Sequence, residues 1–168
     1  MDAMMKAWAA YATPGAEHKA LANMVGTWDA TIKSYIDSSG APTEQKGTST
    51  FTSVMDGRYF IEKAEGEFMG QPFHGIGTYG YDNGTKQYVS TWIDSMGTGI
   101  MTGTGTATEG GKTFNWTSTG YDAMSGKVQS YRSTMHMVSA DQYHMEMFGP
   151  GPDGKEMKMM EITYNRKK

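Results

Sequence analysis

The fold is decided by the stretch Gly26-Thr27-Trp28-Asp29-Ala30-Thr31-Ile32-Lys33-Ser34-Tyr35-Ile36. Its apolar side chains recur at every second residue, so one face holds Trp28, Ala30, Ile32 and Ile36. This period of two predicts a half-buried β-strand. Gly26 allows the backbone to turn sharply just before the strand. We expect this strand to begin a sheet whose interior is closed at one end by Trp28.

Strand patterns continue to the end of the chain, separated by short turns. We expect nine more strands, at residues 47–55, 58–68, 73–81, 87–95, 100–107, 113–121, 128–138, 143–148 and 156–164. Asp56-Gly57 is typical of a tight hairpin turn. The pattern predicts a mainly β protein, a single antiparallel up-and-down barrel of about ten strands. Because barrels of eight strands already hold a small ligand, a cavity follows if this sheet closes.

The first 25 residues have a helical pattern instead. A helix is expected over residues 3–12, where Met4, Trp8 and Tyr11 fall on one face. A second helix is expected over residues 16–24, with Gly26 ending it. Two short helices before a sheet are suited to cover an open end or a face of the barrel.

Length and composition limit the classes of protein that this chain can belong to. The 168 residues predict one domain, with a helical lid at 1–25 and a β-barrel at 26–166. There is no cysteine, which excludes disulfides and zinc–thiolate sites. The net charge of −3 and the scattered basic residues argue against nucleic-acid binding. No apolar run reaches the ~20 residues that a membrane-spanning helix needs.

The compartment stays open on sequence grounds. We find no signal peptide, and Asp2-Ala3-Met4 resembles the residues that follow a cleaved leader. A trimmed leader would place the protein in the periplasm or outside the cell. Otherwise we expect a cytoplasmic protein.

The first and the last strand of the predicted barrel together carry a known signature. Gly26 and Trp28 on the first strand, with Arg166 at the end of the last, resemble the signature of the calycins, which include lipocalins and fatty-acid-binding proteins. In that superfamily the arginine lies across the indole, a cation–π contact worth about 0.5–2 kcal/mol. The resemblance implies that Arg166 covers Trp28 where the barrel closes.

A more specific resemblance covers residues 14–166. Its segments are Pro14-Gly15-Ala16-Glu17-His18, Gly26-Thr27-Trp28, Gly57-Arg58-Tyr59, Gly80-Tyr81-Asp82-Asn83, the run from Tyr88 to Met101, and Met160-Glu161-Ile162-Thr163-Tyr164. They are similar to those of a bacterial family known only as a domain of unknown function, which implies a calycin-like barrel and no particular activity. Haem-binding nitrobindins are wider relatives, but this chain lacks their glycine-rich continuation of the first strand. We therefore expect no haem and no other cofactor.

Two predicted strands carry candidate ligand-binding residues. Tyr88, Trp92 and Asp94 share one face of their strand, and Arg132 and His136 share one face of another. If both faces point inward, an aromatic ring, a carboxylate and two basic groups converge in the cavity. Asp94 and Arg132 would then be partners, since a buried charge costs several kcal/mol unless it is paired. We hypothesise a ligand site formed by these five residues.

Alternatives to this site stay open. Arg132 could clamp an anion or be neutralised structurally by Glu62 or Asp94. On the predicted strand 87–95, the face opposite Trp92 carries Val89 and Ile93 and is also suited to burial, so the Trp92 face could lie outside. The pocket would then be built from the opposite faces: Val89, Thr91, Ile93, Tyr131 and Met135.

The chain shows no pattern typical of a metal centre or an active site. The four histidines, His18, His74, His136 and His144, have no metal-ligand spacing. Met135-His136-Met137 offers Cu(I) ligands chemically, but alternation puts its methionines and its histidine on opposite faces. No nucleophile elbow or phosphate loop is present. We predict no metal site and no catalytic residue.

The sequence favours a non-enzymatic barrel that holds a small, partly apolar ligand in its cavity. One alternative is an enzyme with a carboxylate–histidine pair there, drawn from Glu62, Asp94 and His136. A second is a structural or interaction module whose exposed methionines pair two barrels. The expected partners are an unidentified small molecule and, for the second alternative, a second copy of the chain as a homodimer.

Overall fold

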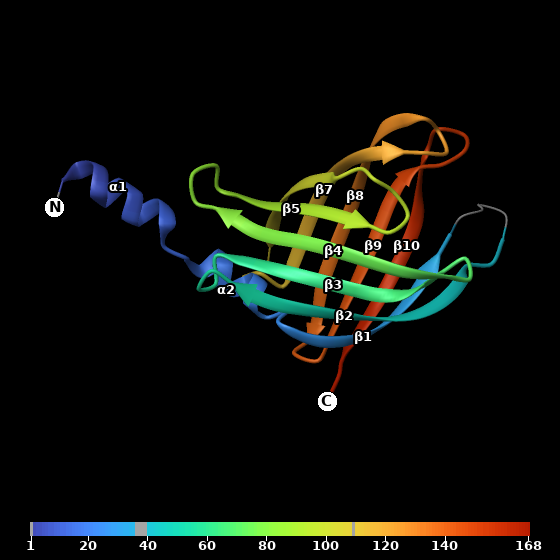
Figure 1. Ribbon diagram of the computed structural model, residues 1–168, viewed down its shortest axis with the longest axis horizontal. Coiled ribbons are helices and arrows are strands. Elements are labelled where there is room, and N and C mark those ends of the chain that lie inside the picture. The colour runs from blue at the N-terminus through green and yellow to red at the C-terminus, as the bar shows by residue number, and fades with distance from the viewer. Residues whose placement is uncertain (1, 36–39, 109) are drawn as a thin grey trace.

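The computed structural model describes residues 2–35, 40–108 and 110–168. Within these ranges two helices precede ten strands (Figure 1). They are α1 (Ala3–Ala12), α2 (Ala16–Ala22), β1 (Gly26–Ser34), β2 (Thr43–Val54), β3 (Tyr59–Phe68), β4 (Gln71–Asp82), β5 (Gln87–Asp94), β6 (Met101–Thr108), β7 (Thr113–Asp122), β8 (Lys127–Ser139), β9 (Gln142–Pro150) and β10 (Glu156–Arg166). The predicted strands are all present. β1 ends at Ser34, so Tyr35 lies just beyond the strand, and Ile36 lies outside the described residues.

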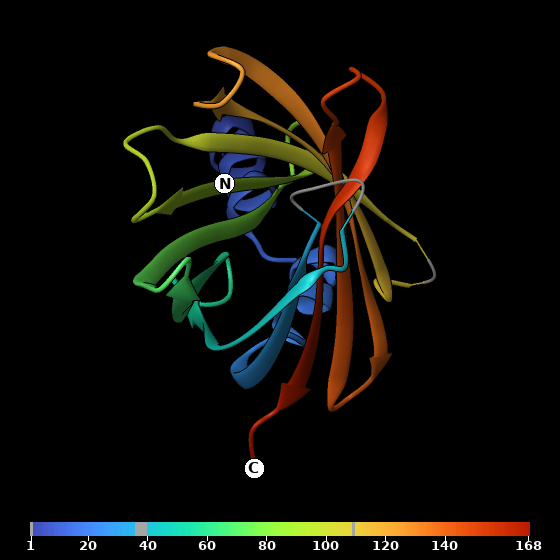
Figure 2. The same cartoon turned by 90° about the vertical axis from the view of Figure 1, so that its right-hand side faces the viewer.

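The sheet closes on itself. Each strand pairs antiparallel with its neighbours in the sequence, and β1 also pairs with β10. That closing seam aligns Trp28 with Arg166 and Ser34 with Met160. Figure 2 shows the strands arranged around a central axis. The predicted fold, a mainly β up-and-down barrel with short N-terminal helices, is confirmed.

Arg166 fixes the seam at the start of β1. Its guanidinium carbon lies 4.0 Å from the centre of the Trp28 ring, the contact that the calycin resemblance implied. The guanidinium also donates hydrogen bonds to the carbonyl oxygens of Asn23 and Val25, at 3.0 and 2.7 Å. Gly26 is needed here, because its φ is +134° and a Cβ would lie 2.5 Å from a guanidinium nitrogen of Arg166.

The packed core lies at the α2 end of the barrel. Leu21 of α2 and Met24 are almost fully buried, and Trp28 Nε1 donates a hydrogen bond to the Met24 carbonyl at 2.8 Å. Besides Trp28, the large aromatic side chains in this core are Phe51, Phe60, Tyr88, Phe114, Trp116, Tyr143 and Tyr164. Helix α2 and this core therefore close one end of the barrel.

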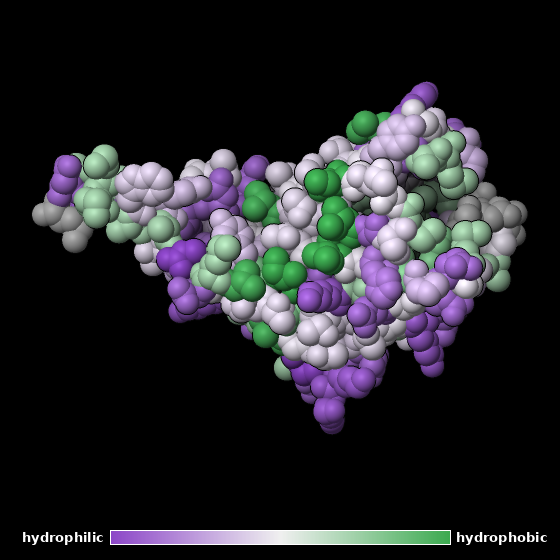
Figure 3. All heavy atoms as spheres, in the orientation of Figure 1, coloured by the Kyte–Doolittle hydropathy of each residue, from purple (hydrophilic) through white to green (hydrophobic). Residues whose placement is uncertain are grey.

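Helix α1 does not cover the barrel. It has no buried residue, and Figures 1 and 3 show it standing clear of the strands as an arm. Trp8, on the apolar face predicted for this helix, is 63% exposed. The C-terminal end of the arm is attached to the barrel, where the Asn83 side chain donates hydrogen bonds to the carbonyl oxygens of Tyr11 and Thr13 and Arg58 Nε donates one to the carbonyl oxygen of Ala12. No helix in the described ranges is long and apolar enough to span a membrane.

Candidate functional site

A cavity of about 440 Å³ occupies the barrel interior beyond the core. Its lining is mainly apolar and includes six methionines and seven aromatic residues. These are Met96, Met101, Met135, Met145, Met147, Met160, Phe68, Phe73, Tyr79, Trp92, Trp116, Tyr131 and Tyr164. Met96 is 53% exposed and also lines the cavity, so the cavity reaches solvent where β5 joins β6.

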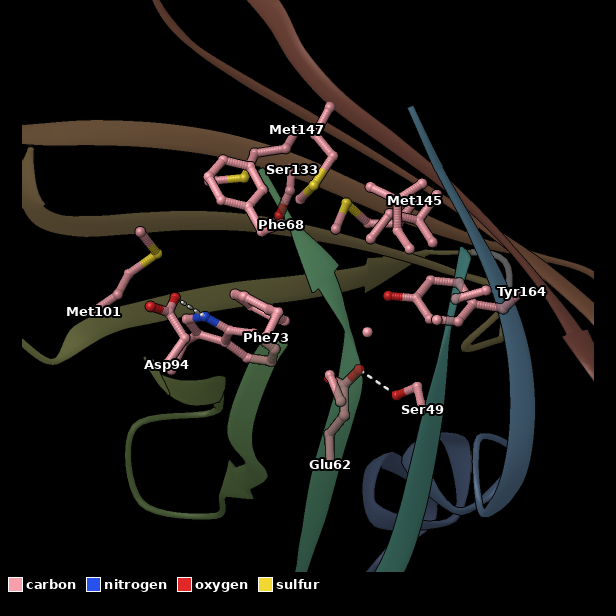
Figure 4. Close-up of a pocket in the computed structure, with 18 of the residues that line it drawn as sticks. Ser49, Glu62, Phe68, Phe73, Asp94, Met101, Ser133, Met145, Met147 and Tyr164 are labelled. Carbon is pink, nitrogen blue, oxygen red and sulfur yellow. Dashed lines mark hydrogen bonds between the residues drawn. The ribbon is translucent and has the colours of Figure 1, made fainter. Parts of the chain in front are cut away.

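Glu62 of β3 places a buried acid in the cavity wall. The residue is 3% exposed. One carboxyl oxygen accepts a hydrogen bond from Ser49 Oγ at 2.5 Å (Figure 4), and the other accepts one from the Tyr79 hydroxyl at 2.8 Å. No ion pair to Glu62 is formed by the described residues. A buried carboxyl without a counter-charge is costly and marks a candidate functional group.

The surroundings of Glu62 supply neutral hydroxyl groups. Figure 4 shows the Tyr164 hydroxyl and the Glu62 carboxyl directed at the same interior space. The Tyr164 ring stacks on Tyr143, with ring centres 4.1 Å apart. Burial raises the pKa of Tyr79 and of Tyr164 well above the ordinary value, and the Glu62 charge raises both further. Burial also raises the pKa of Glu62, while the Ser49 and Tyr79 hydrogen bonds lower it.

A second carboxyl group lies nearer the rim. Asp94 ends β5, where one of its oxygens accepts a hydrogen bond from Trp92 Nε1 at 2.8 Å. Its other oxygen accepts one from the Met96 backbone at 2.9 Å. These two bonds fix the indole and the carboxylate as one unit in the cavity wall.

The structure brings part of the predicted ligand site together. Trp92 and Asp94 both line the cavity, so their shared face points inward. Tyr88 lies on the same face but belongs to the closed end, where it is buried in the core and its hydroxyl donates to the Glu17 carbonyl of α2 at 3.3 Å. It covers the end of the barrel and does not line the cavity.

Arg132 and His136 lie on the outer wall, so the expected convergence of all five residues inside the barrel is wrong. The Arg132 guanidinium pairs with the exposed Glu156 carboxylate at 2.8 Å and covers the Phe148 ring at 4.2 Å. The exposed His136 bonds through Nδ1 with Thr113 Oγ1 at 2.8 Å. The inward face of β8 is the opposite one, which the alternative had named in part: Tyr131, Ser133 and Met135 line the cavity.

One residue group in the described ranges has metal-ligand geometry, and it lies outside the cavity. The ligand atoms of His144, Glu146 and Glu161 lie within 4.8 Å of one another. The Lys158 ammonium group already pairs with both carboxylates, and the Lys33 ammonium group pairs with Glu161 at 3.5 Å, so two cations of the chain balance the two carboxylates. We therefore do not assign a metal site to these three residues.

Among the described residues, the cavity lining does not include the histidine that the enzyme alternative requires. None of the four histidines, all of them in the described part of the chain, lines the cavity. His18 is a buried residue of α2, and its Nδ1 accepts a hydrogen bond from the Gly15 backbone at 3.0 Å. A carboxylate–histidine pair inside the cavity is thus not formed.

Fold and site together define a calycin-like barrel, closed at one end by a helix and holding an internal cavity at the other. The chain belongs to the family described as "Protein of unknown function (DUF1579)", whose model matches residues 13–166. The resemblance to a family of unknown function is therefore confirmed. A search of curated protein sequences found no match.

Solved structures share the fold at low sequence identity. Rv2717c from M. tuberculosis is 12% identical, with a TM-score of 0.65 over 93% of this chain and 100% of that one. The S-type phycobiliprotein lyase CPES from Guillardia theta is 13% identical, with a TM-score of 0.61 over 94% and 96%. EF1p2_mFAP2b, solved bound to DFHBI, is 14% identical, with a TM-score of 0.50 over 90% and 99%. These likenesses show the barrel fold alone.

Proposed function

We propose that this protein binds a small, largely apolar molecule inside its barrel, without catalysing a reaction on it. The observation that carries the proposal is the cavity of about 440 Å³, which lies within the usual size range of ligand sites. Its walls combine apolar groups with a few fixed polar ones, Glu62 and Asp94 among them. That combination is typical of sites that bury an apolar body and orient it through a few hydrogen bonds.

The methionine content supports the same conclusion. Six methionines line the cavity, and their unbranched thioether side chains adapt to ligands of irregular shape. This adaptability accounts for the position of several of the 16 methionines on the inward faces of β8, β9 and β10. The barrel solved with DFHBI supports the proposal in a general way, since it is an example of a related fold that holds a small molecule.

Binding of the neutral fluorescent probe N-phenyl-1-naphthylamine tests the proposal. We expect saturable binding at one site, with a blue shift and an increase in probe emission. Ser133→Phe fills the cavity from β8 and should weaken binding at least about tenfold, because the added ring occupies ligand space. Ser130→Phe makes the same change on the exposed outer face of β8 and should leave binding unaltered. Equal affinity in both variants, each shown to be folded by circular dichroism, would contradict a site in the barrel.

A further inference from the structure

The charged groups of the cavity are of one sign. The ionisable acids in its lining are Glu62, Glu65, Glu67 and Asp94, and no lysine, arginine or histidine of the described chain lines it. Glu65 and Glu67 are exposed and alternate on β3 with the inward residues, so their carboxylates point outward. The two carboxyl groups that face the interior are therefore Glu62 and Asp94.

This arrangement disfavours an anionic ligand. A fatty-acid carboxylate placed at the deep end of the cavity would lie beside Glu62, with no cation in the described lining to neutralise either group. Like charges in a low-dielectric interior repel strongly and cannot both stay ionised. The guanidinium that the sequence suggested for this role, that of Arg132, is on the outer wall and already paired with Glu156.

The same arrangement is suited to a cation. The hydroxyl groups of Ser49 and Tyr79 each donate to a different oxygen of Glu62, which stabilises the ionised carboxylate. What the described residues do not supply is a positive partner. An ammonium group at this position would pair with Glu62 and meet the aromatic rings of Tyr79 and Trp116, whose centres are 5.8 Å apart in the cavity wall.

We propose that the cavity binds an organic cation, a small alkylammonium or arylammonium amphiphile whose charged group pairs with Glu62 and whose apolar body lies among the methionines. This rests on the proposed ligand-binding function and assigns its ligand class. Asp94, held by Trp92 near the rim, adds negative potential along the way into the cavity.

Binding of such a cation depends on pH in a defined direction. Burial raises the pKa of Glu62, so a proton competes with the ammonium group for the carboxylate. The other groups that face Glu62 are Ser49 on β2, Tyr79 on β4, Tyr143 on β9 and Tyr164 on β10, all neutral at physiological pH. Affinity for the cation should tighten as pH rises through the pKa of Glu62 in the free protein, and then become constant.

The test compares three probes of equal chain length by isothermal titration calorimetry: 1-octylammonium, 1-octanol and octanoate. At about pH 7.5 we expect the wild-type protein to bind octylammonium at least about tenfold more tightly than octanoate, with octanol between them. Octylammonium affinity should rise with pH as Glu62 loses its proton, because the amine stays charged throughout this change. Octanol affinity should not change with pH.

Two matched variants locate the effect. Glu62→Gln should weaken octylammonium binding at least about tenfold, leave octanol binding within about threefold and abolish the pH dependence. Glu44→Gln makes the same change on the outward face of β2, at an exposed residue that does not line the cavity, and should alter none of these affinities. The proposal would be overturned if the wild type bound octylammonium no more tightly than octanoate, or if the two variants had equal effects. In either case, binding of octanol would still support a ligand-binding barrel. Failure of all three probes to bind would contradict both proposals.

Discussion

At the scale of single residues, Trp28 carries the largest expected contribution to stability. Its side chain is fully buried between the closing seam and the core, beneath Arg166 and against Tyr143, whose ring centre is 4.7 Å away. We expect Trp28→Ala to lower the free energy of unfolding by about 3–5 kcal/mol, as large buried truncations do. That is a large part of the ~5–15 kcal/mol that stabilises a typical domain.

Urea denaturation followed by circular dichroism measures this effect. Trp8→Ala is the matched control, because Trp8 projects from α1 into solvent. It should change the free energy of unfolding by no more than about 0.5 kcal/mol. Similar losses in the two variants would show that the seam does not hold the barrel together.

The buried acid Glu62 also makes stability depend on pH. Its pKa is raised in the folded state above the ordinary 4.5, so between those two values the folded protein binds more protons than the unfolded one. The contribution of Glu62 to stability therefore falls as pH rises through this window and is constant above it. A Glu62→Gln variant lacks this contribution, because its amide side chain cannot ionise.

The measurement is the difference in unfolding free energy between the wild type and Glu62→Gln, followed across pH. We expect the wild type to lose stability relative to the variant as pH rises above about 4.5. The Glu65→Gln variant should show no such trend, because Glu65 is exposed. A wild type that gains stability relative to Glu62→Gln over this range would show that Glu62 is ionised and favourably paired in the folded protein.

At the scale of elements, the two helices differ in what they contribute. α2 buries His18, Ala20 and Leu21 against the barrel, whereas α1 buries nothing. Deleting residues 1–10 should therefore leave the free energy of unfolding within about 1 kcal/mol of the full chain and keep a single cooperative transition. Leu21→Ala in α2 should cost about 2–5 kcal/mol. Loss of cooperative unfolding in the truncated protein would show that α1 is integral to the fold.

The strands were predictable because alternation and turn residues are local signals. β1 needs only Trp28, Ala30 and Ile32 on one face, and the hairpin turns carry their own glycine and aspartate markers. Which face points inward is not local, since it depends on closure of the whole sheet. On β5 both faces carry large side chains, and Trp92 rather than Ile93 lines the cavity.

On β8 the sequence did contain a signal for the correct face. Met135 is buried and shares its face with Tyr131 and Ser133, whereas the Arg132 and His136 face carries groups that solvent and Glu156 can satisfy. The prediction failed because it sought charge partners inside the barrel for Asp94. Asp94 is satisfied instead by two hydrogen-bond donors from its own segment.

At the scale of the whole molecule, the cavity results from the number of strands and the position of the core. Ten strands enclose more space than the aromatic residues at the α2 end fill. Glu62 was recognisable as unusual, since it shares one face of β3 with the apolar residues Phe60, Ala64 and Phe68. Its lack of a charged partner among the described residues was not recognisable, because that depends on strands far apart in the sequence.

The methyl groups of methionine test most directly whether the barrel interior is the ligand site. We would label the methionine methyl carbons with ¹³C and record their NMR spectra while adding N-phenyl-1-naphthylamine. The ligand-binding proposal predicts shifts for methionines that line the cavity, Met101, Met135, Met145, Met147 and Met160, and none for the exposed Met4, Met5, Met55 and Met124. Shifts confined to Met4 and Met5 would place the probe on the α1 arm and contradict a binding site inside the barrel.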